Sequence, residues 1–257
     1  MNPIDRSVDL LRHSHHAIGL TGAGVSTHSG IPDFRSPGSG IWEQVDPFEV
    51  ASIFAFRRQP EVFFNWFRPL ARQLHEAQPN PAHQALAQLE AAGILKAVIT
   101  QNIDGLHQKA GSRCVLEVHG NLRQATCIRC YRVFPTEAFI ETFMTDGHVP
   151  ICPKCGNVLK PNVILFGEQL PAAVMQEAQH HVSQCDVMLV AGSSLEVVPV
   201  SDLPHLAQRR GARVILVNLQ PTYMDAQADL LFRADVVDIL PQIAQACGMP
   251  APEYDRA

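Results

Sequence analysis

A glycine-rich loop placed directly after a short apolar stretch constrains the fold of this 257-residue chain more than any other feature. The apolar stretch covers residues 16–20, and the loop then reads Gly22-Ala23-Gly24-Val25-Ser26 and continues to Ser36 through Ile-Pro-Asp-Phe-Arg. A strand that ends in closely spaced glycines lets backbone N–H groups approach a pyrophosphate, as in dinucleotide-binding α/β folds. Thr27 stands where the G-x-G-x-x-G fingerprint has its third glycine, which argues against an ordinary redox dinucleotide domain.

Short apolar runs that are rich in β-branched residues alternate with helical stretches along the chain. The predicted strands cover residues 17–21, 96–100, 115–118, 162–166, 187–191 and 214–217, and helices are expected over 81–92 and 171–184. This alternation predicts an α/β fold in which a parallel sheet carries helices on both faces. Ligands bind beyond the carboxyl ends of the strands in such sheets, so the polar residues at these ends are expected to converge on one cleft.

Four of the seven cysteines form two Cys-x-x-Cys pairs, Cys127/Cys130 and Cys152/Cys155, which 21 residues separate. Each pair presents two thiolates to one ion, and two such pairs complete a tetrahedral zinc site. Four thiolates leave no position for water, so we expect one structural zinc ion per chain. A zinc-ribbon nucleic-acid module is an alternative for this segment alone, and the formal net charge of −5 weakens it.

Two segments break the alternation of strands and helices and predict inserts that overhang the cleft. Residues 37–80 are rich in aromatic side chains and contain no obvious strand, which indicates a helical insert. Residues 122–159 hold the paired cysteines and show little apolar periodicity. We therefore expect a Rossmann-like domain of residues 1–36, 81–121 and 160–257, a helical insert of residues 37–80, and a zinc-binding small domain of residues 122–159.

Composition narrows the class of protein further. Hydrophobic residues make up 46% of the chain and charged residues 18%, which is the balance of an ordinary globular protein. No apolar run approaches the ~20 residues that span a bilayer, and residues 1–16 lack the apolar segment of a secretion signal. We therefore expect a cytoplasmic protein that binds neither membranes nor nucleic acid directly.

A group of polar residues follows the predicted strand 96–100. Gln101, Asn102 and Asp104 offer hydrogen bonds of different polarity, which suits the binding of a ribose and a carboxamide. The alternative interpretation is a helix start that Asn102 or Asp104 caps. The residue types and their spacing alone leave both interpretations open.

His119 is the candidate general base among the twelve histidines. It ends the predicted strand 115–118, and Gly120 after it permits a close approach of backbone or ligand. His107 is a rival base, although it lies past the turn and is expected to be further from the cleft.

Taken together and in this order, these motifs resemble those of the sirtuins, the NAD-dependent protein lysine deacylases. The resemblance covers the glycine loop, the segments Gln-Asn-Ile-Asp and Val-His-Gly-Asn, the run Phe166-Gly167-Glu168, the loop after Gly192, and Asn218. It implies that NAD is consumed as a co-substrate, that the acyl group of an acylated lysine in a protein or peptide passes to ADP-ribose, and that nicotinamide leaves. A protein mono-ADP-ribosyltransferase is the alternative function, because it cleaves NAD in the same way with a different nucleophile.

The resemblance also implies a role for individual residues. His119 and Asn102 would be catalytic, with His119 as general base on a ribose hydroxyl. The NAD-binding residues would be Gly22, Ala23, Gly24, Ser26, Ile31, Asp33, Phe34, Arg35, Gln101, Asn102, Ile103, Asp104, Gly192, Ser193, Ser194, Asn218 and Val236. The acyl-lysine substrate would contact Val163, Leu165, Phe166, Gly167, Glu168, Val197, Phe67 and Leu70.

The helical insert carries a further implication for the acyl group. Sirtuins that prefer succinyl- or malonyl-lysine resemble one another in a Tyr-x-x-Arg pair on this insert. Counting without gaps from Pro60 puts Phe67 at the Tyr position and Leu70 at the Arg position. The arginine guanidinium, which pairs with a carboxylate through two hydrogen bonds, is then missing. We therefore expect neutral acyl groups to be preferred over succinyl or malonyl groups.

Overall fold

The computed structural model of this protein describes residues 2–34, 40–43 and 45–251. Arg35, one of the expected NAD-binding residues, lies outside the described residues. Among the described residues, no helix combines the length and the apolar character that crossing a membrane would need.

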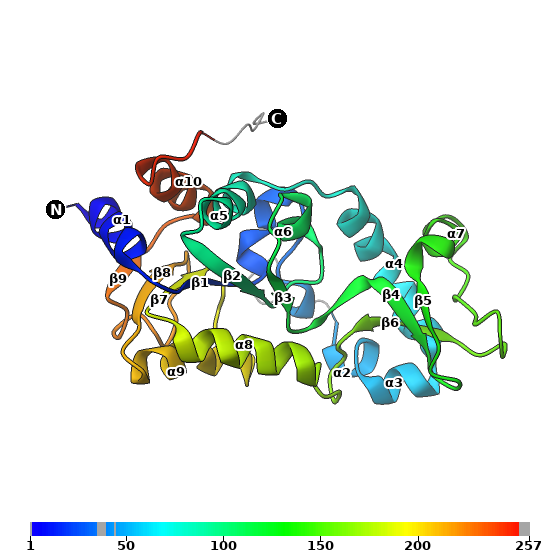
Figure 1. The fold of residues 1–257 in the computed structure, drawn as a ribbon. Helices are drawn as coiled ribbons and strands as arrows, with labels where there is room; N and C mark the ends of the chain where they lie inside the picture. Colours follow the sequence, from blue (N-terminus) through cyan, green and yellow to red (C-terminus); the bar gives the residue numbers. More distant parts are fainter. Residues whose placement is uncertain (1, 35–39, 44, 252–257) are drawn as a thin grey trace.

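A six-stranded parallel sheet, in the order β3-β2-β1-β7-β8-β9, forms the centre of the larger part of the molecule (Figure 1). Its strands are β1 (Ala17–Thr21), β2 (Leu95–Thr100), β3 (Val115–Glu117), β7 (Val187–Ala191), β8 (Arg213–Val217) and β9 (Leu230–Phe232). The chain runs outward from β1 to β3 on one side and from β7 to β9 on the other. The neighbouring strands β1 and β7 therefore flank the switch point, where ligands bind in sheets of this kind.

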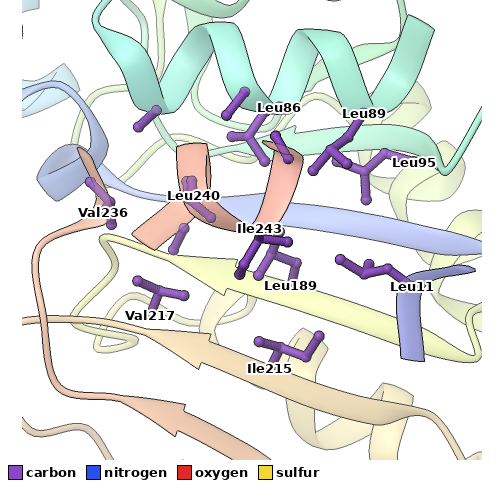
Figure 2. Close-up of a cluster of buried hydrophobic side chains, with 14 of the residues drawn as sticks. Leu11, Leu86, Leu89, Leu95, Leu189, Ile215, Val217, Val236, Leu240 and Ile243 are labelled. Atoms are coloured by element: carbon purple, nitrogen blue, oxygen red, sulfur yellow. The ribbon is translucent and has the colours of Figure 1, made fainter. Parts of the chain in front are cut away.

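Helices cover both faces of this sheet (Figure 1). One face carries α1 (Pro3–His13), α5 (Pro81–Ala91) and α10 (Val236–Ala246), and the other carries α8 (Ala172–Gln184) and α9 (Leu203–Arg209). Figure 2 shows the core on the first face, where Leu86 and Leu89 of α5 and Leu240 and Ile243 of α10 meet Leu189 of β7. The strands between these layers are buried on both faces, so they form continuous apolar runs in the sequence.

The described part of residues 37–80 is helical. It contains α2 (Pro47–Val50), α3 (Ile53–Arg58) and α4 (Pro60–Glu76). Outside this segment, the short helix α6 (Leu106–Lys109) follows β2 and packs beside α5. Pro69 lies inside α4, which nevertheless runs as one helix and buries one face that includes Phe63, Phe67 and Leu70. In the described part of the chain, 3-10 turns also form at Ala23–Val25, Thr27–Ser29, Ile41–Glu43, Thr136–Ala138 and Val200–Asp202.

A small antiparallel sheet of three strands, in the order β5-β4-β6, lies at one end of the molecule. It consists of β4 (Gly120–Cys127), β5 (Val133–Pro135) and β6 (Leu159–Val163), with α7 (Ile140–Asp146) in the connection. The prediction that residues 162–166 form a strand of the parallel sheet is wrong, because the chain here ends β6 and pairs with β4, with Val163 opposite Gly120. β9 takes the remaining place in the parallel sheet, and its three residues were too few to predict.

Candidate active site and metal site

Two loops cross beyond the carboxyl ends of β1 and β7. The first loop contains the 3-10 turns Ala23–Val25 and Thr27–Ser29, and the second begins at Gly192. A Cβ atom on Gly24 would lie 2.9 Å from the carbonyl oxygen of Gly192, and a Cβ atom on Gly192 would lie 2.4 Å from the nitrogen of Val25. Glycine is therefore required at both positions, because the two backbones touch.

The hydrogen bonds of the glycine loop differ from the simple expectation of N–H groups that point at a phosphate. Gly22 N–H donates to the carbonyl of Ala191 at 3.3 Å, and Gly24 N–H donates to that of Gly192 at 2.8 Å. These two donors hold the loops together. Ala23 N–H has no acceptor among the described residues, so it is the donor that this part of the loop can offer to an anion.

A cavity of about 660 Å³, here named the central cavity, opens where the two loops cross. His119 lines it. The expected NAD-binding residues that line it are Gly22, Ala23, Gly24, Asp33, Phe34, Gln101, Asn102, Ile103, Gly192, Ser193, Ser194, Asn218 and Val236. The expected substrate-binding residues that line it are Val163, Leu165, Phe166, Gly167, Glu168, Val197, Phe67 and Leu70. The fold thus gathers residues from the whole length of the chain around one space.

His119 lies in the turn between β3 and β4. Its Nδ1 is 3.0 Å from the carbonyl oxygen of Gln101, so Nδ1 carries the proton and donates it to that carbonyl. This hydrogen bond leaves the lone pair on Nε2, which is the form of the ring that a general base needs. The Gln101 side chain donates to the Ser193 hydroxyl at 2.9 Å, and the Ile164 N–H donates to the His119 carbonyl at 2.8 Å. The backbone around the histidine is therefore fixed from two sides.

Ser26, Ile31 and Asp104 were also expected at the NAD site, and they lie outside the lining of the central cavity. Ser26 and Ile31 are buried, with exposed fractions of 1% and 7%. These residues support the wall from behind, and direct contact with a bound molecule would need the wall to move.

Ser26 is the centre of a buried hydrogen-bond network that holds this wall. Its hydroxyl accepts from the Asn102 amide at 3.0 Å and donates to the Asp104 carboxylate at 2.7 Å. His83 Nδ1 accepts from the Asn80 N–H at 3.3 Å, so His83 Nε2 carries the proton and donates to the Ser26 hydroxyl, also at 3.3 Å. Burial raises the pKa of Asp104. The Ser26 hydroxyl thus donates one hydrogen bond and accepts two, which is its full capacity. The network therefore fixes the side chain of Asn102 at the cavity.

His107 lies behind the wall and is 1% exposed, so it does not reach the central cavity. Its Nε2 is 2.9 Å from the hydroxyl of Thr21, which itself donates to the hydroxyl of Thr100, so Nε2 carries the proton. Its Nδ1 is buried and has no hydrogen-bond partner among the described residues. A second proton on this ring would have no acceptor, and burial lowers the pKa of His107 to about 4.

We expect the neutral state of His107 to make folding sensitive to acid between about pH 6.5 and 4. Its pKa is lower in the folded chain than in the unfolded chain, so below pH 6.5 the unfolded chain binds more protons and the free energy of unfolding falls as the pH falls. The loss from this one group is on the order of 3 kcal/mol. Urea unfolding of a His107→Gln variant should show a shallower dependence on pH over this window.

The matched control for this experiment is His148→Gln, because the His148 side chain is 79% exposed. The control should keep the slope of the unchanged protein. If His107→Gln also kept that slope, the neutral buried state of His107 would be contradicted.

Aromatic side chains close one end of the central cavity. Phe63, Phe67 and Leu70 lie four and three residues apart on α4 and therefore share one face. Trp66 stacks on Trp42, with ring centres 5.5 Å apart, and both line the same space. Among the described residues that line the central cavity, none is a lysine or an arginine. This end of the cavity suits a neutral, apolar group.

Several residues at the site were not assigned to it from the sequence. Trp42, Phe63 and Trp66 were assigned only to the helical insert, although the helical spacing of Phe63 and Trp66 with Leu70 could have indicated a shared face. His83 carries no such signal, because it belongs to the capping box of α5 and contacts Ser26 across 57 residues of sequence.

The four paired cysteines meet at one end of the three-stranded sheet, with all four Sγ atoms within 4.8 Å of one another. The Sγ distances are 3.4 Å for Cys127 and Cys155 and 3.8 Å for Cys130 and Cys152. Zn–S bonds of about 2.3 Å in a tetrahedron place sulfur atoms about 3.8 Å apart, so the cluster has the size of a zinc site. Burial opposes ionisation, but the N–H groups of Cys130 and Arg129 hold the pKa of Cys127 at about 6, which favours the thiolate.

A Cys130→Ser variant is expected to lose zinc and to unfold or aggregate. The apolar cluster around the site has only four buried residues, and two of them are the ligands Cys127 and Cys152, so the metal supplies much of the stability here. The unchanged protein should carry about one zinc per chain by elemental analysis. Cys114→Ser, at a cysteine outside the cluster, should keep both zinc and the thermal transition. A soluble, zinc-free and fully active Cys130→Ser protein would contradict the structural role.

Comparison with known proteins identifies the family. Residues 22–199 match the Sir2 family, and the chain belongs to this family. Among its relatives, the NAD-dependent protein deacylase 2 of Archaeoglobus fulgidus is 45% identical over 243 residues, which cover 94% of this chain and 95% of the relative.

Two solved structures resemble the chain over nearly its whole length. One is a histidine-to-alanine variant of Sir2 with a deacetylated p53 peptide and 3′-O-acetyl ADP ribose. Its TM-score is 0.90 and its sequence identity is 39%, and the match covers 96% of this chain and 99% of that chain. The other is Sir2Tm bound to a propionylated peptide, with a TM-score of 0.86, 38% identity, and the same coverage of 96% and 99%. The parallel sheet with helices on both faces and the four-cysteine module are thus the fold of a Sir2 protein.

Proposed function

We propose that this protein is an NAD-dependent protein lysine deacylase, which transfers the acyl group of acyl-lysine to ADP-ribose and releases nicotinamide. The observation that carries the proposal is the position of His119. Its Nδ1–H is held by the carbonyl of Gln101, and its ring lines the same cavity as two crossed loops and an apolar, aromatic end. The family supports the same activity, as do the similar structures, one with a deacetylated peptide and 3′-O-acetyl ADP ribose and the other with a propionylated peptide.

We propose that NAD lies across the carboxyl ends of β1 and β7, where it supplies the acyl acceptor. Ala23 N–H and the hydroxyls of Ser193 and Ser194 offer hydrogen bonds to its polar groups, and Asn102 faces the same space. The other cavity residues proposed to hold it are Gly22, Gly24, Asp33, Phe34, Gln101, Ile103, Gly192, Asn218 and Val236. Arg35, outside the described residues, is proposed to join them, and Ser26, Ile31 and Asp104 are proposed to act through the wall that they support. His119 Nε2 takes a proton from a ribose hydroxyl, and the ring of Phe34 keeps water from the reacting centre.

We propose that the substrate peptide lies along the extended segment after β6. This segment borders the central cavity and is held on one side by hydrogen bonds between Phe166 and the backbone of Ala51 and Ile53, at 2.9 and 3.0 Å. The residues proposed to contact the peptide are Val163, Leu165, Phe166, Gly167, Glu168 and Val197. Phe67 and Leu70 are proposed to line the channel for the acyl group.

The proposed division into domains follows the expected residue ranges: 1–36, 81–121 and 160–257 for the NAD-binding part, 37–80 for the helical insert, and 122–159 for the zinc module. The strands β4 and β6 extend past the ends of the last range, so the zinc module continues into the NAD-binding part through shared strands. The four thiolates that hold zinc need a reducing compartment, which supports a cytoplasmic location.

The direct test is incubation with NAD and an acetyl-lysine peptide, with both products identified by mass spectrometry. The proposal requires free lysine on the peptide together with nicotinamide and O-acetyl-ADP-ribose in equal amounts. ADP-ribose attached to protein, with the acetyl-lysine intact, would show that the enzyme is a mono-ADP-ribosyltransferase instead.

A further inference from the structure

A second cavity of about 660 Å³ lies behind the strand that forms one wall of the central cavity. We name it the rear cavity. Side chains along β6 and the residues after it alternate between the two spaces, because Lys160 and Asn162 line the rear cavity while Val163 and Leu165 line the central one. Ile164 borders both cavities. The rear cavity is thus a separate space with a wall in common with the candidate active site.

The acidic groups of the rear cavity are already neutralised within the protein. Both carboxylate oxygens of the buried Glu117 accept hydrogen bonds from the guanidinium of Arg123. Glu168 accepts from the ammonium of the buried Lys160 at 2.9 Å. Each carboxylate therefore already has a cationic partner within the protein, so neither needs a cationic ligand for neutralisation.

Hydrogen-bond donors of the rear cavity, in contrast, stay available. Arg57, on α3, lines the cavity, is exposed, and has no ion-pair partner among the described residues. Asn121 uses its Oδ1 to accept from the Arg123 N–H at 3.1 Å, so the group that it can offer to a ligand is the amino group at Nδ2. The members of the two acid–base pairs neutralise each other, and Cys127, which also lines the cavity, belongs to the proposed zinc site. Arg57 therefore adds a positive charge that no described residue pairs with.

The rest of the wall is largely apolar. Ile53 from α3, Ile164 after β6, and Val174 from the first turn of α8 face the space, together with Leu116 and Pro171. We propose that the rear cavity is a second ligand site, which takes a small organic acid with its carboxylate at Arg57 and its apolar body against Ile53, Ile164 and Val174.

The position of the rear cavity connects it to the candidate base. Gly120 lines the rear cavity and follows His119, which lines the central one. A Cβ atom on Gly120 would lie 2.0 Å from the carbonyl oxygen of Asn162, so β4 and β6 touch at this point. A ligand in the rear cavity therefore contacts the same two strands that hold the turn of His119.

Isoleucine methyl groups report on the two cavities separately. Ile53 and Ile128 line only the rear cavity, and Ile103 lines only the central one. We would titrate protein labelled with ¹³C at the isoleucine δ1 methyls with sodium octanoate and, in parallel, with octanamide, which has the same chain and no charge. Octanoate is expected to shift the Ile53 and Ile128 signals and to bind there more tightly than octanamide.

Variants at two neighbouring exposed positions of α3 supply the matched control. Arg57→Gln should weaken octanoate at the Ile53 and Ile128 signals about two- to fivefold, as for an exposed ion pair. Arg58→Gln, at the next residue, removes the same charge outside both cavities and should leave the affinity unchanged. Asn121→Asp keeps the acceptor for the Arg123 N–H, replaces the donor by a negative charge, and should weaken octanoate about tenfold or more.

Three results would overturn the proposal. Octanoate shifts that are confined to Ile103 would place the acid in the central cavity only. Equal affinity for octanoate and octanamide, or equal effects of Arg57→Gln and Arg58→Gln, would show that no carboxylate is recognised. The experiment uses neither NAD nor acylated peptide, so its failure would leave the proposed deacylase activity standing.

Discussion

Replacing His119 with alanine is expected to reduce deacetylation of an acetyl-lysine peptide by about 10²- to 10⁴-fold, the usual cost of removing a general base. The geometry supports a loss in the chemical step. The ring lines the central cavity, and its Nδ1–H bond to the Gln101 carbonyl leaves the basic lone pair on Nε2. Steady-state rates with saturating NAD and peptide would measure the effect as a fall in kcat.

Binding of NAD to the His119→Ala variant should be nearly unchanged by calorimetry, because the crossed loops at Gly24 and Gly192 are held by their own backbone hydrogen bond. His148→Ala, which removes an exposed ring, is the control for the loss of a histidine and should keep full activity. Near-normal turnover of His119→Ala would contradict its role as the base. Loss of NAD binding together with activity would indicate that the ring is structural.

The central sheet could be predicted from the sequence because its strands are buried on both faces. Every residue of β1 and β7 is buried, most of them are apolar, and each strand is followed by a glycine loop, so both the strands and their carboxyl ends can be predicted. The segment 162–166 also looks like a strand, because residues 163–166 form a continuous apolar run. Such a run predicts an extended backbone but does not identify the strand that it pairs with, and here Val163 pairs with β4 of the small sheet.

The candidate site was predictable where it depends on strand ends and unpredictable where it depends on contacts across the fold. Gln101 and His119 follow neighbouring parallel strands, so their meeting at one edge of the sheet follows from topology. The glycine loop was expected to point its N–H groups at a phosphate, but that of Gly22 binds the last residue of β7 and that of Gly24 binds the second loop. This hydrogen bonding depends on how closely the two loops approach each other, and no local sequence pattern predicts that distance.

The second large effect expected concerns the acyl group: acetyl-lysine should be a better substrate than succinyl-lysine by about 10²-fold or more in kcat/KM. Burying an unpaired carboxylate costs several kcal/mol, and each 1.4 kcal/mol is about a factor of ten. Phe67 and Leu70 line the central cavity, and Arg68 and Arg72 on the same helix are directed away from it. Their guanidinium groups donate to backbone carbonyls of α7, from Arg68 Nε to Met144 at 3.0 Å and from Arg72 Nε to the same oxygen at 3.0 Å.

A longer neutral chain should be tolerated, since the same end of the cavity is lined by aromatic rings. The measurement compares kcat/KM for one peptide that carries acetyl-, myristoyl- or succinyl-lysine. Faster removal of succinyl than of acetyl would show that Phe67 and Leu70 have been placed wrongly in the acyl channel.

A change at Leu70 would test the physical reason for this selectivity. In a Leu70→Arg variant, a cation reaches the acyl end of the cavity from the face of α4 that already lines it, and Arg can pair with a carboxylate through two hydrogen bonds. We expect the ratio of succinyl to acetyl efficiency to rise about tenfold or more, mainly because the carboxylate is no longer buried without a partner. Leu70→Gln is the matched control, since it introduces polarity of similar length without charge. If Leu70→Gln raised the ratio as much as Leu70→Arg, polarity alone would account for the selectivity. The difference between the two variants therefore isolates the missing charge as the feature that excludes acidic acyl groups.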